Sequence, residues 1–286
     1  MSVTQTTSTG STAASTRRAK WSNSGLIGLI VILFWIVVAV IGPWLIPERL
    51  LDMGPGVFEG ISTQHWLGTD YLGRDILARV VQGAQYTLGV AACATFFACF
   101  CGLSFGLLAA VLGGWLDTLI SRSMDTLISI PSKMLALVVV AAFGSSIPLL
   151  ILTAGIVYTP GAFRIARSLA VNINALDFVT VAKMRGEKTI YIMFREILPN
   201  MKGPLLADMG LRFIYVVLLM ASLGFLGLGI QPPDADWGSL VRENIGALAS
   251  GGVSVLAPAL AIASLTIAVN MVVDHLPGSS DDQGGH

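Results

Sequence analysis

Two short motifs in this sequence have residue types that enzymes use, and neither has the surroundings that its chemistry needs. Gly186-Glu187-Lys188-Thr189 is similar to the end of a phosphate-binding loop, but Glu187 stands where that loop requires glycine, so consecutive backbone amides cannot wrap a phosphate. Gly102-Leu103-Ser104-Phe105-Gly106 fits the G-x-S-x-G elbow of hydrolases, which requires a turn from a strand into a helix. This pentapeptide lies instead in a long charge-free window. The sequence therefore predicts that the chain is not catalytic by itself.

Metal and proton chemistry are the next possibilities. The histidines lie on different segments without the spacing of metal ligands, so we expect no metal site and no cofactor in this chain; they are His65, His275 and His286. Asp208 and Arg212 are four residues apart and can pair along one face of a helix. Because ionisable groups near a membrane span are functional candidates, two interpretations stay open: a structural pair at the membrane interface, or a proton-coupled secondary transporter that uses this pair.

The elements around these residues are set by an apolar composition. Of the 286 residues, 54% are hydrophobic and 12% charged, and the formal net charge is zero. This excludes a typical soluble enzyme, and no basic patch points to nucleic acid. Five windows carry no Lys, Arg, Asp or Glu, and each exceeds the roughly 20 residues that cross a bilayer; they are 21–47, 80–116, 134–163, 213–233 and 244–273. The sequence therefore predicts an all-α, polytopic membrane protein.

Charge asymmetry gives the number of spans and their orientation. Seven cations lie in 164–202 and three in the N-terminal tail, so the positive-inside rule places both segments in the cytoplasm. An even number of spans must then separate them, and the turn-forming residues 144–148 divide the third window into two short helices. We expect both termini to be cytoplasmic and six transmembrane helices, near 26–47, 86–112, 127–143, 147–163, 205–229 and 253–274.

The cytoplasmic segment 164–203 has its own helical pattern. A helix is expected over 175–185, with Asp177 in its first turn, and Gly186 follows where a left-handed C-cap is usual. From Thr189 a second, amphipathic helix is expected, which Pro199 ends. Two interpretations are open: helices lying on the inner leaflet, or a coupling-helix loop that receives force from a cytoplasmic partner.

The residues of this segment resemble a known family. Thr180-Val181-Ala182, Gly186 and Leu198-Pro199 follow the E-A-A-x3-G-x9-I-x-L-P loop of ATP-binding-cassette importer permeases, with Thr180 in place of the Glu. The resemblance implies that this loop couples to a partner ATPase, and we assign that coupling to the residues in or flanking the motif: Asp177, Thr180, Ala182, Gly186, Leu198 and Pro199.

Two further stretches resemble the dipeptide and oligopeptide branch of these permeases. The first is similar to an H-x-L-G-T-D-x-x-G-R-D signature, here with Gly68, Thr69, Asp70, Gly73, Arg74 and Asp75. The second is similar to S-F-L-G-L-G-x-Q-P-P-x3-W-G at the end of span five, here with Gly227, Gly229, Gln231, Pro232, Pro233, Trp237 and Gly238.

The resemblance covers roughly residues 20–275 and implies the C-type permease subunit of a peptide-class importer in the bacterial inner membrane. It further implies a homologous second permease, two cytoplasmic subunits that bind ATP and Mg, and an extracytoplasmic solute-binding protein. Dipeptides or oligopeptides are the implied solutes, with nickel chelates and glutathione as alternatives within the family. A receptor-like or structural membrane protein is a third interpretation, and it would not copurify with an ATPase.

The same resemblance, together with the span pattern, suggests four segments. They are a cytoplasmic tail at 1–24, a first transmembrane helix and external loop at 25–84, a permease domain at 85–276, and an acidic tail at 277–286 that is rich in Gly and Ser and expected to be disordered.

Overall fold

The computed structural model describes residues 23–47, 50–54, 56–250 and 252–276. The tail expected to be disordered at 277–286 and nearly all of the N-terminal tail, 1–22, lie outside the described residues. Within the described ranges the chain is helical and has no strand; Thr69 and Asp75 form an isolated β-bridge.

Five helical segments are long and apolar enough to cross a membrane: α1 (Asn23–Leu45), α2 (Ile76–Leu112), α5 (Ile147–Asn174), the run Thr189–Phe225 and α10 (Val253–Val273). Helices α3 (Gly114–Ser129) and α4 (Ser132–Phe143) are bent by 82° relative to each other, and only taken together are they long and apolar enough to count as a sixth candidate span. The shorter elements are α6 (Asp177–Met184), α9 (Trp237–Glu243) and a 3-10 turn, η4 (Ile245–Ser250). The prediction of an all-α, polytopic protein is therefore confirmed.

The expected boundary of the second span was wrong by ten residues, because α2 begins at Ile76 rather than at 86. The Asp75 side chain caps the helix by accepting from the Ala78 amide, and Arg79 is buried in the first turns instead of ending the apolar segment. The fourth span is also longer than expected, since α5 continues from Ile147 to Asn174.

The third span is not the single helix expected over 127–143. It breaks between α3 and α4 at Ile130, whose backbone is extended (φ −90°, ψ 126°). The cause is Pro131, because a residue before proline is driven out of the helical region. The expected turn between the third and fourth spans is confirmed: Gly144 ends α4 with a positive φ of 92° and α5 starts at Ile147.

Pro199 does not end a helix as expected. The run from Thr189 continues through α7 (Thr189–Tyr191), a π-helical turn η2 (Ile192–Ile197), a 3-10 turn η3 (Leu198–Met201) and α8 (Lys202–Phe225). Pro199 stands in the first turn of η3, where its missing N–H leaves no hydrogen bond unmade. The segment before the fifth span is therefore continuous with that span, and α8 ends at Phe225 rather than at 229.

The closest helix pair is α2 with α5, and glycines on α2 permit it. A methyl group added to Gly102 would lie 2.4 Å from the Ala162 Cβ, and one added to Gly106 would lie 2.8 Å from the Ala166 Cβ. Such small-residue spacing lets helix backbones approach closely in a membrane.

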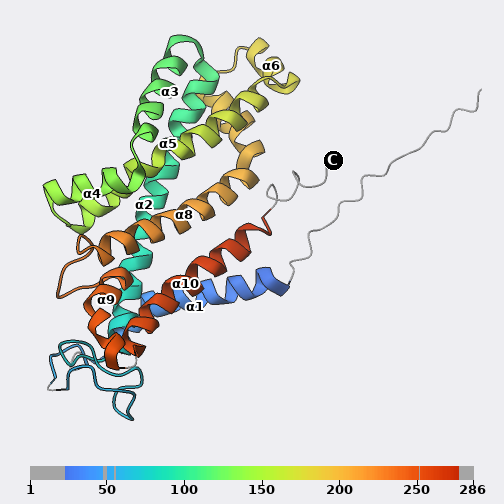
Figure 1. The fold of residues 1–286 in the computed structure, drawn as a ribbon. Helices are drawn as coiled ribbons and strands as arrows, with labels where there is room; N and C mark the ends of the chain where they lie inside the picture. Colours follow the sequence, from blue (N-terminus) through green and yellow to red (C-terminus); the bar gives the residue numbers. More distant parts are fainter. Residues whose placement is uncertain (1–22, 48–49, 55, 251, 277–286) are drawn as a thin grey trace, which may run out of the picture.

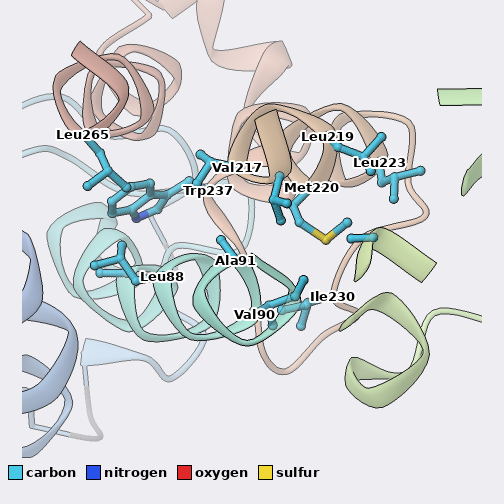
Figure 2. Packing of buried hydrophobic residues seen from close by; sticks show 14 of the residues in the cluster. Leu88, Val90, Ala91, Val217, Leu219, Met220, Leu223, Ile230, Trp237 and Leu265 are labelled. Carbon is cyan, nitrogen blue, oxygen red and sulfur yellow. The ribbon is translucent and has the colours of Figure 1, made fainter. Parts of the chain in front are cut away.

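Trp237 is at the centre of the main core. Figure 2 shows its ring close to Leu88, Val217 and Leu265, which come from three different helices. The ring also packs edge-on against Trp35, with 4.7 Å between the two ring centroids, and its Nε1–H donates to the Val80 carbonyl at 2.9 Å.

Figure 1 shows α6 and α3 at one end of the molecule, and α9 with the loop that precedes α2 at the opposite end. We refer to these as the α6 end and the α9 end. Helices α1 and α10 lie side by side between them.

Candidate functional site

The expected coupling loop forms a capped helical turn at the α6 end. Gly186 has a φ of +78°. Its N–H donates to the Lys183 carbonyl, and the Glu187 N–H donates to the Ala182 carbonyl. These two bonds are a Schellman motif, so the predicted left-handed glycine cap is confirmed. The helix itself is shorter than expected, because residues 175 and 176 end α5 and precede α6.

The predicted coupling residues lie in different surroundings within this turn. Asp177, Thr180, Gly186 and Pro199 are exposed, and Leu198 is half-buried. Ala182 and Val179 are fully buried, and Val179 belongs to a cluster with residues of η2. Val179 therefore packs α6 against the body of the protein, while the exposed residues face outward.

The outward side of this turn is apolar with a basic rim. We call it the α6 surface; it comprises the exposed side chains Phe178, Val181, Met184, Ile190 and Phe194 and the exposed cations Lys183, Arg185, Lys188 and Arg195. The stripe expected from residue 190 onward is divided between the core and this surface: Met193 and Ile197 are buried, whereas Ile190 and Phe194 are exposed.

Two contacts join the α6 end to the helices behind it. Arg167 on α5 donates to both carboxylate oxygens of Asp117 on α3, at 2.6 and 2.5 Å. Asn174, the last residue of α5, donates to the Ala110 carbonyl near the end of α2 at 3.1 Å. These bonds fix the α6-proximal half of α5 to α2 and α3.

Asp208 and Arg212 form the expected pair and also join two helices. The Arg212 guanidinium donates to both oxygens of Asp208 at 2.7 Å and to the Tyr158 carbonyl on α5 at 3.1 Å. In return the Tyr158 hydroxyl donates to the Tyr215 carbonyl on α8 at 3.0 Å. A side chain on Gly161 would meet the guanidinium at 2.7 Å. This geometry gives the pair a structural role between α5 and α8.

The first signature stretch is a compact turn at the α9 end. Asp70 accepts from the backbone N–H groups of Leu72 and Arg74 and, at 2.7 Å, from the Arg74 side chain. Gly68 and Gly73 have positive φ, and a Cβ on either would collide with a backbone carbonyl. Thr69 is buried and its hydroxyl donates to the Gly56 carbonyl, while Asp75 caps α2. These signature residues therefore fix the loop that leads into α2.

A buried ion network then ties this loop to α9. Glu243 accepts from Arg74 at 3.5 Å and from Arg79 at 3.3 Å, and Arg79 also donates to the Pro233 carbonyl at 2.8 Å. Arg79 and Glu243 were missed by sequence reasoning, although an arginine at the edge of a long charge-free window was an available signal.

The second signature stretch wraps the buried carboxylate of Asp236. Its oxygens accept from the Ile230 and Ser239 amides, at 3.0 and 2.9 Å, and cap α9. Burial raises the pKa of Asp236, and the amide donors oppose that shift. A Cβ on Gly229 would lie 2.5 Å from this carboxylate, and one on Gly238 would lie 2.4 Å from the Ala221 carbonyl, so both glycines are needed for packing.

The remaining signature residues complete the same turn. Gly227 has a φ of +83°, and a Cβ on it would lie 2.9 Å from the Arg242 guanidinium carbon. The Gln231 side chain donates to the carbonyls of Gly227 and Gly229. Pro232 and Pro233 are exposed and joined by a cis peptide bond, and Trp237 begins α9. A hollow of ≈ 380 Å³ lies between this turn, Tyr71 and α9. No group of three or more His, Cys, Asp or Glu in the described part of the chain could hold a metal ion.

Comparisons with known proteins agree with this architecture. Residues 102–278 match the family described as binding-protein-dependent transport system inner membrane component. The chain is 35% identical to the dipeptide transport system permease protein DppC of Alkalihalophilus pseudofirmus, over 93% of this chain and 88% of that protein. It is 33% identical to DppC of Haemophilus influenzae (92% and 91%) and 34% identical to the glutathione transport system permease protein GsiD of Escherichia coli (93% and 88%). On this match, which covers nearly the whole chain of each relative, the protein belongs to the family of binding-protein-dependent transport system inner membrane components.

Proposed function

We propose that this chain is the transmembrane permease subunit of an ATP-driven importer for peptide-class solutes. It forms half of the pathway and couples to a cytoplasmic ATPase through the α6 surface. The relatives are named for dipeptide and glutathione transport, which supports a peptide-class solute. The chain itself is not the motor, and ATP and Mg are bound by partner subunits.

The α6 surface is the observation that supports this proposal most directly. Five apolar side chains are exposed within residues 178–194, on α6, α7 and η2, and exposed apolar clusters rimmed by polar groups mark interaction sites. Met184, the most exposed of them, is 75% exposed. Four exposed cations lie in the same stretch and favour a partner with an acidic groove. The same basic residues favour a cytoplasmic position for the α6 end.

The position of α6 explains how a push on it reaches the pathway. The element lies between α5 and the continuous run Thr189–Phe225, so both neighbouring spans connect to it directly. The Arg212 and Tyr158 bonds join those two spans to each other. Closure of the ATPases would then move α5 and α8 as one unit, which is the kind of rigid-body motion that switches access between two sides of a membrane.

The other partners follow from the same arrangement. We place a homologous second permease beside this chain, two ATP-binding subunits against the two α6 surfaces, and a solute-binding protein at the α9 end outside the bacterial inner membrane. Both termini are then cytoplasmic.

Copurification tests the proposal with a matched pair of variants. Met184→Glu puts a charge on the α6 surface, and Met53→Glu puts the same charge on an equally exposed methionine (76%) at the α9 end. We expect Met184→Glu to lower ATPase recovery in mild detergent by more than about tenfold, since an interface core excludes unpaired charge, and Met53→Glu to leave it unchanged. Equal recovery in both variants contradicts the assignment. Solute uptake that persists without ATP would favour the proton-coupled alternative.

A further inference from the structure

Helix α3 carries a row of polar side chains that stays exposed in the described part of the chain. On α3, Thr118, Arg122, Asp125 and Ser129 recur at helical spacing and all are exposed, while Met124 is the buried residue of this helix. By contrast, beyond its first residue Asn23 the exposed residues of α1 are apolar, including Leu33, Phe34 and Val37. Lipid can cover α1, but it cannot solvate the α3 stripe.

The break between α3 and α4 extends this polar face. Ser129, Ile130, Pro131 and Lys133 are all exposed, and the backbone at Ile130 is extended rather than helical. Irregular backbone at membrane depth occurs only where it is buried in protein or lines a water-filled cavity. The exposure of this break rules out burial within the chain itself.

A cavity of ≈ 310 Å³ opens next to the break. Its walls come from Pro131 and Ser132 at the break, from Tyr158 and Arg164 on α5, and from Arg212 on α8. Arg164 pairs with Asp125 of the α3 stripe at 2.7 Å, and these two side chains remain 55% and 53% exposed. The cavity therefore offers the cationic groups of Arg164 and Arg212, and the exposed carboxylate of Asp125 lies beside it, paired with Arg164.

We infer that the α3 stripe, the α3–α4 break and this cavity line the aqueous passage through which the polar solute moves. A zwitterionic solute suits it, because its carboxylate and ammonium groups find arginine and aspartate side chains along one wall. The alternative, a dry contact with the second permease, fits poorly, since interface cores are depleted of charged residues. The inference deepens the proposed function by naming the wall of the pathway, and it rests on that function for the presence of a solute.

Thiol accessibility in the assembled transporter tests the inference. Cys93, Cys99 and Cys101 are first replaced by alanine and uptake is checked in that background. Ser129→Cys at the break is then compared with Val37→Cys on the lipid-facing side of α1, using a charged thiosulfonate reagent applied to membranes open on both sides. The reagent needs a thiolate, which forms in water and not in an apolar environment.

We expect Ser129→Cys to be labelled at least about tenfold faster than Val37→Cys. We also expect the attached group to block uptake and a saturating dipeptide to slow the labelling. Labelling of Ser129→Cys no faster than that of Val37→Cys would place the stripe against lipid and overturn the inference. Protection in the intact complex together with crosslinking to the second permease would overturn it in favour of an interface. Failure of the chain without cysteine substitutions to copurify with an ATPase is a separate result. It would refute the proposed function, whereas the labelling rates test only the position of the α3 stripe.

Discussion

Substitution of Gly186 separates strain within this chain from contact with a partner. Its φ is +78°, a region that costs an L-residue about 1–2 kcal/mol. A Cβ built on it meets no atom within 4 Å. Alanine and phenylalanine therefore carry a similar backbone cost, and the Cβ of either residue has open space around it. Asparagine carries less strain, because it tolerates the left-handed region.

A cost of about 1–2 kcal/mol lowers the equilibrium ratio of the capped to the uncapped turn by a factor of about 5 to 30. We expect Gly186→Asn to keep most of the coupling between ATP hydrolysis and uptake, and Gly186→Ala to lose part of it. Gly186→Phe should lose more than alanine and also reduce ATPase copurification, because its ring would occupy space that the ATPase fills in the complex.

The assay is ATP hydrolysed per solute transported, measured in proteoliposomes at matched protein levels. The informative quantity is the difference in this ratio between Gly186→Phe and Gly186→Ala, because both variants carry the same backbone strain. If the two variants behave alike, nothing docks at Gly186 and the α6 surface must be reassigned.

Three further predictions concern the helix packing and the α9 end. Gly102→Ala places a methyl group 2.4 Å from a side chain of α5 and should lower the free energy of unfolding by about 1–3 kcal/mol. Gly89→Ala, which meets nothing within 4 Å, should leave it unchanged or raise it by up to about 1 kcal/mol; thermal unfolding in detergent compares the two. Arg79→Met removes one of the two cations that contact the Glu243 carboxylate and should lower the free energy of unfolding by about 3 kcal/mol. Its control is Arg185→Met, which removes an exposed cation 4.0 Å from Glu187 and should change that free energy by less than about 0.5 kcal/mol. Equal losses in the two variants would contradict the buried network. Burial raises the pKa of Asp236, so the folded protein loses stability as pH rises from about 4, the unfolded value, through that raised pKa. Over this window the stability of the native chain should therefore fall relative to that of Asp236→Asn. A difference between the two unfolding midpoints that does not vary with pH would refute this.

The sequence predicted the fold class and the cap of the coupling turn, because both depend on local composition. A long charge-free window indicates a span because the bilayer core is apolar, and a glycine after a helical pattern indicates a left-handed cap. The same reasoning placed the turn at Gly144 correctly. It placed the start of α2 too late, because it treated Arg79 as the edge of an apolar segment.

What the sequence by itself determined, then, is the set of apolar spans, the glycine cap and the segments that resemble the permease family. Only the tertiary structure decided which polar residues are buried together. Arg79 and Glu243 are 164 residues apart and meet because α2 and α9 pack side by side. Local periodicity carries no information on such pairs, since the energy that compensates for burying a charge comes from a partner far away in the chain. The same holds for the α3 stripe, which becomes a candidate passage only once the packed helices show that its polar side chains stay exposed in the described chain.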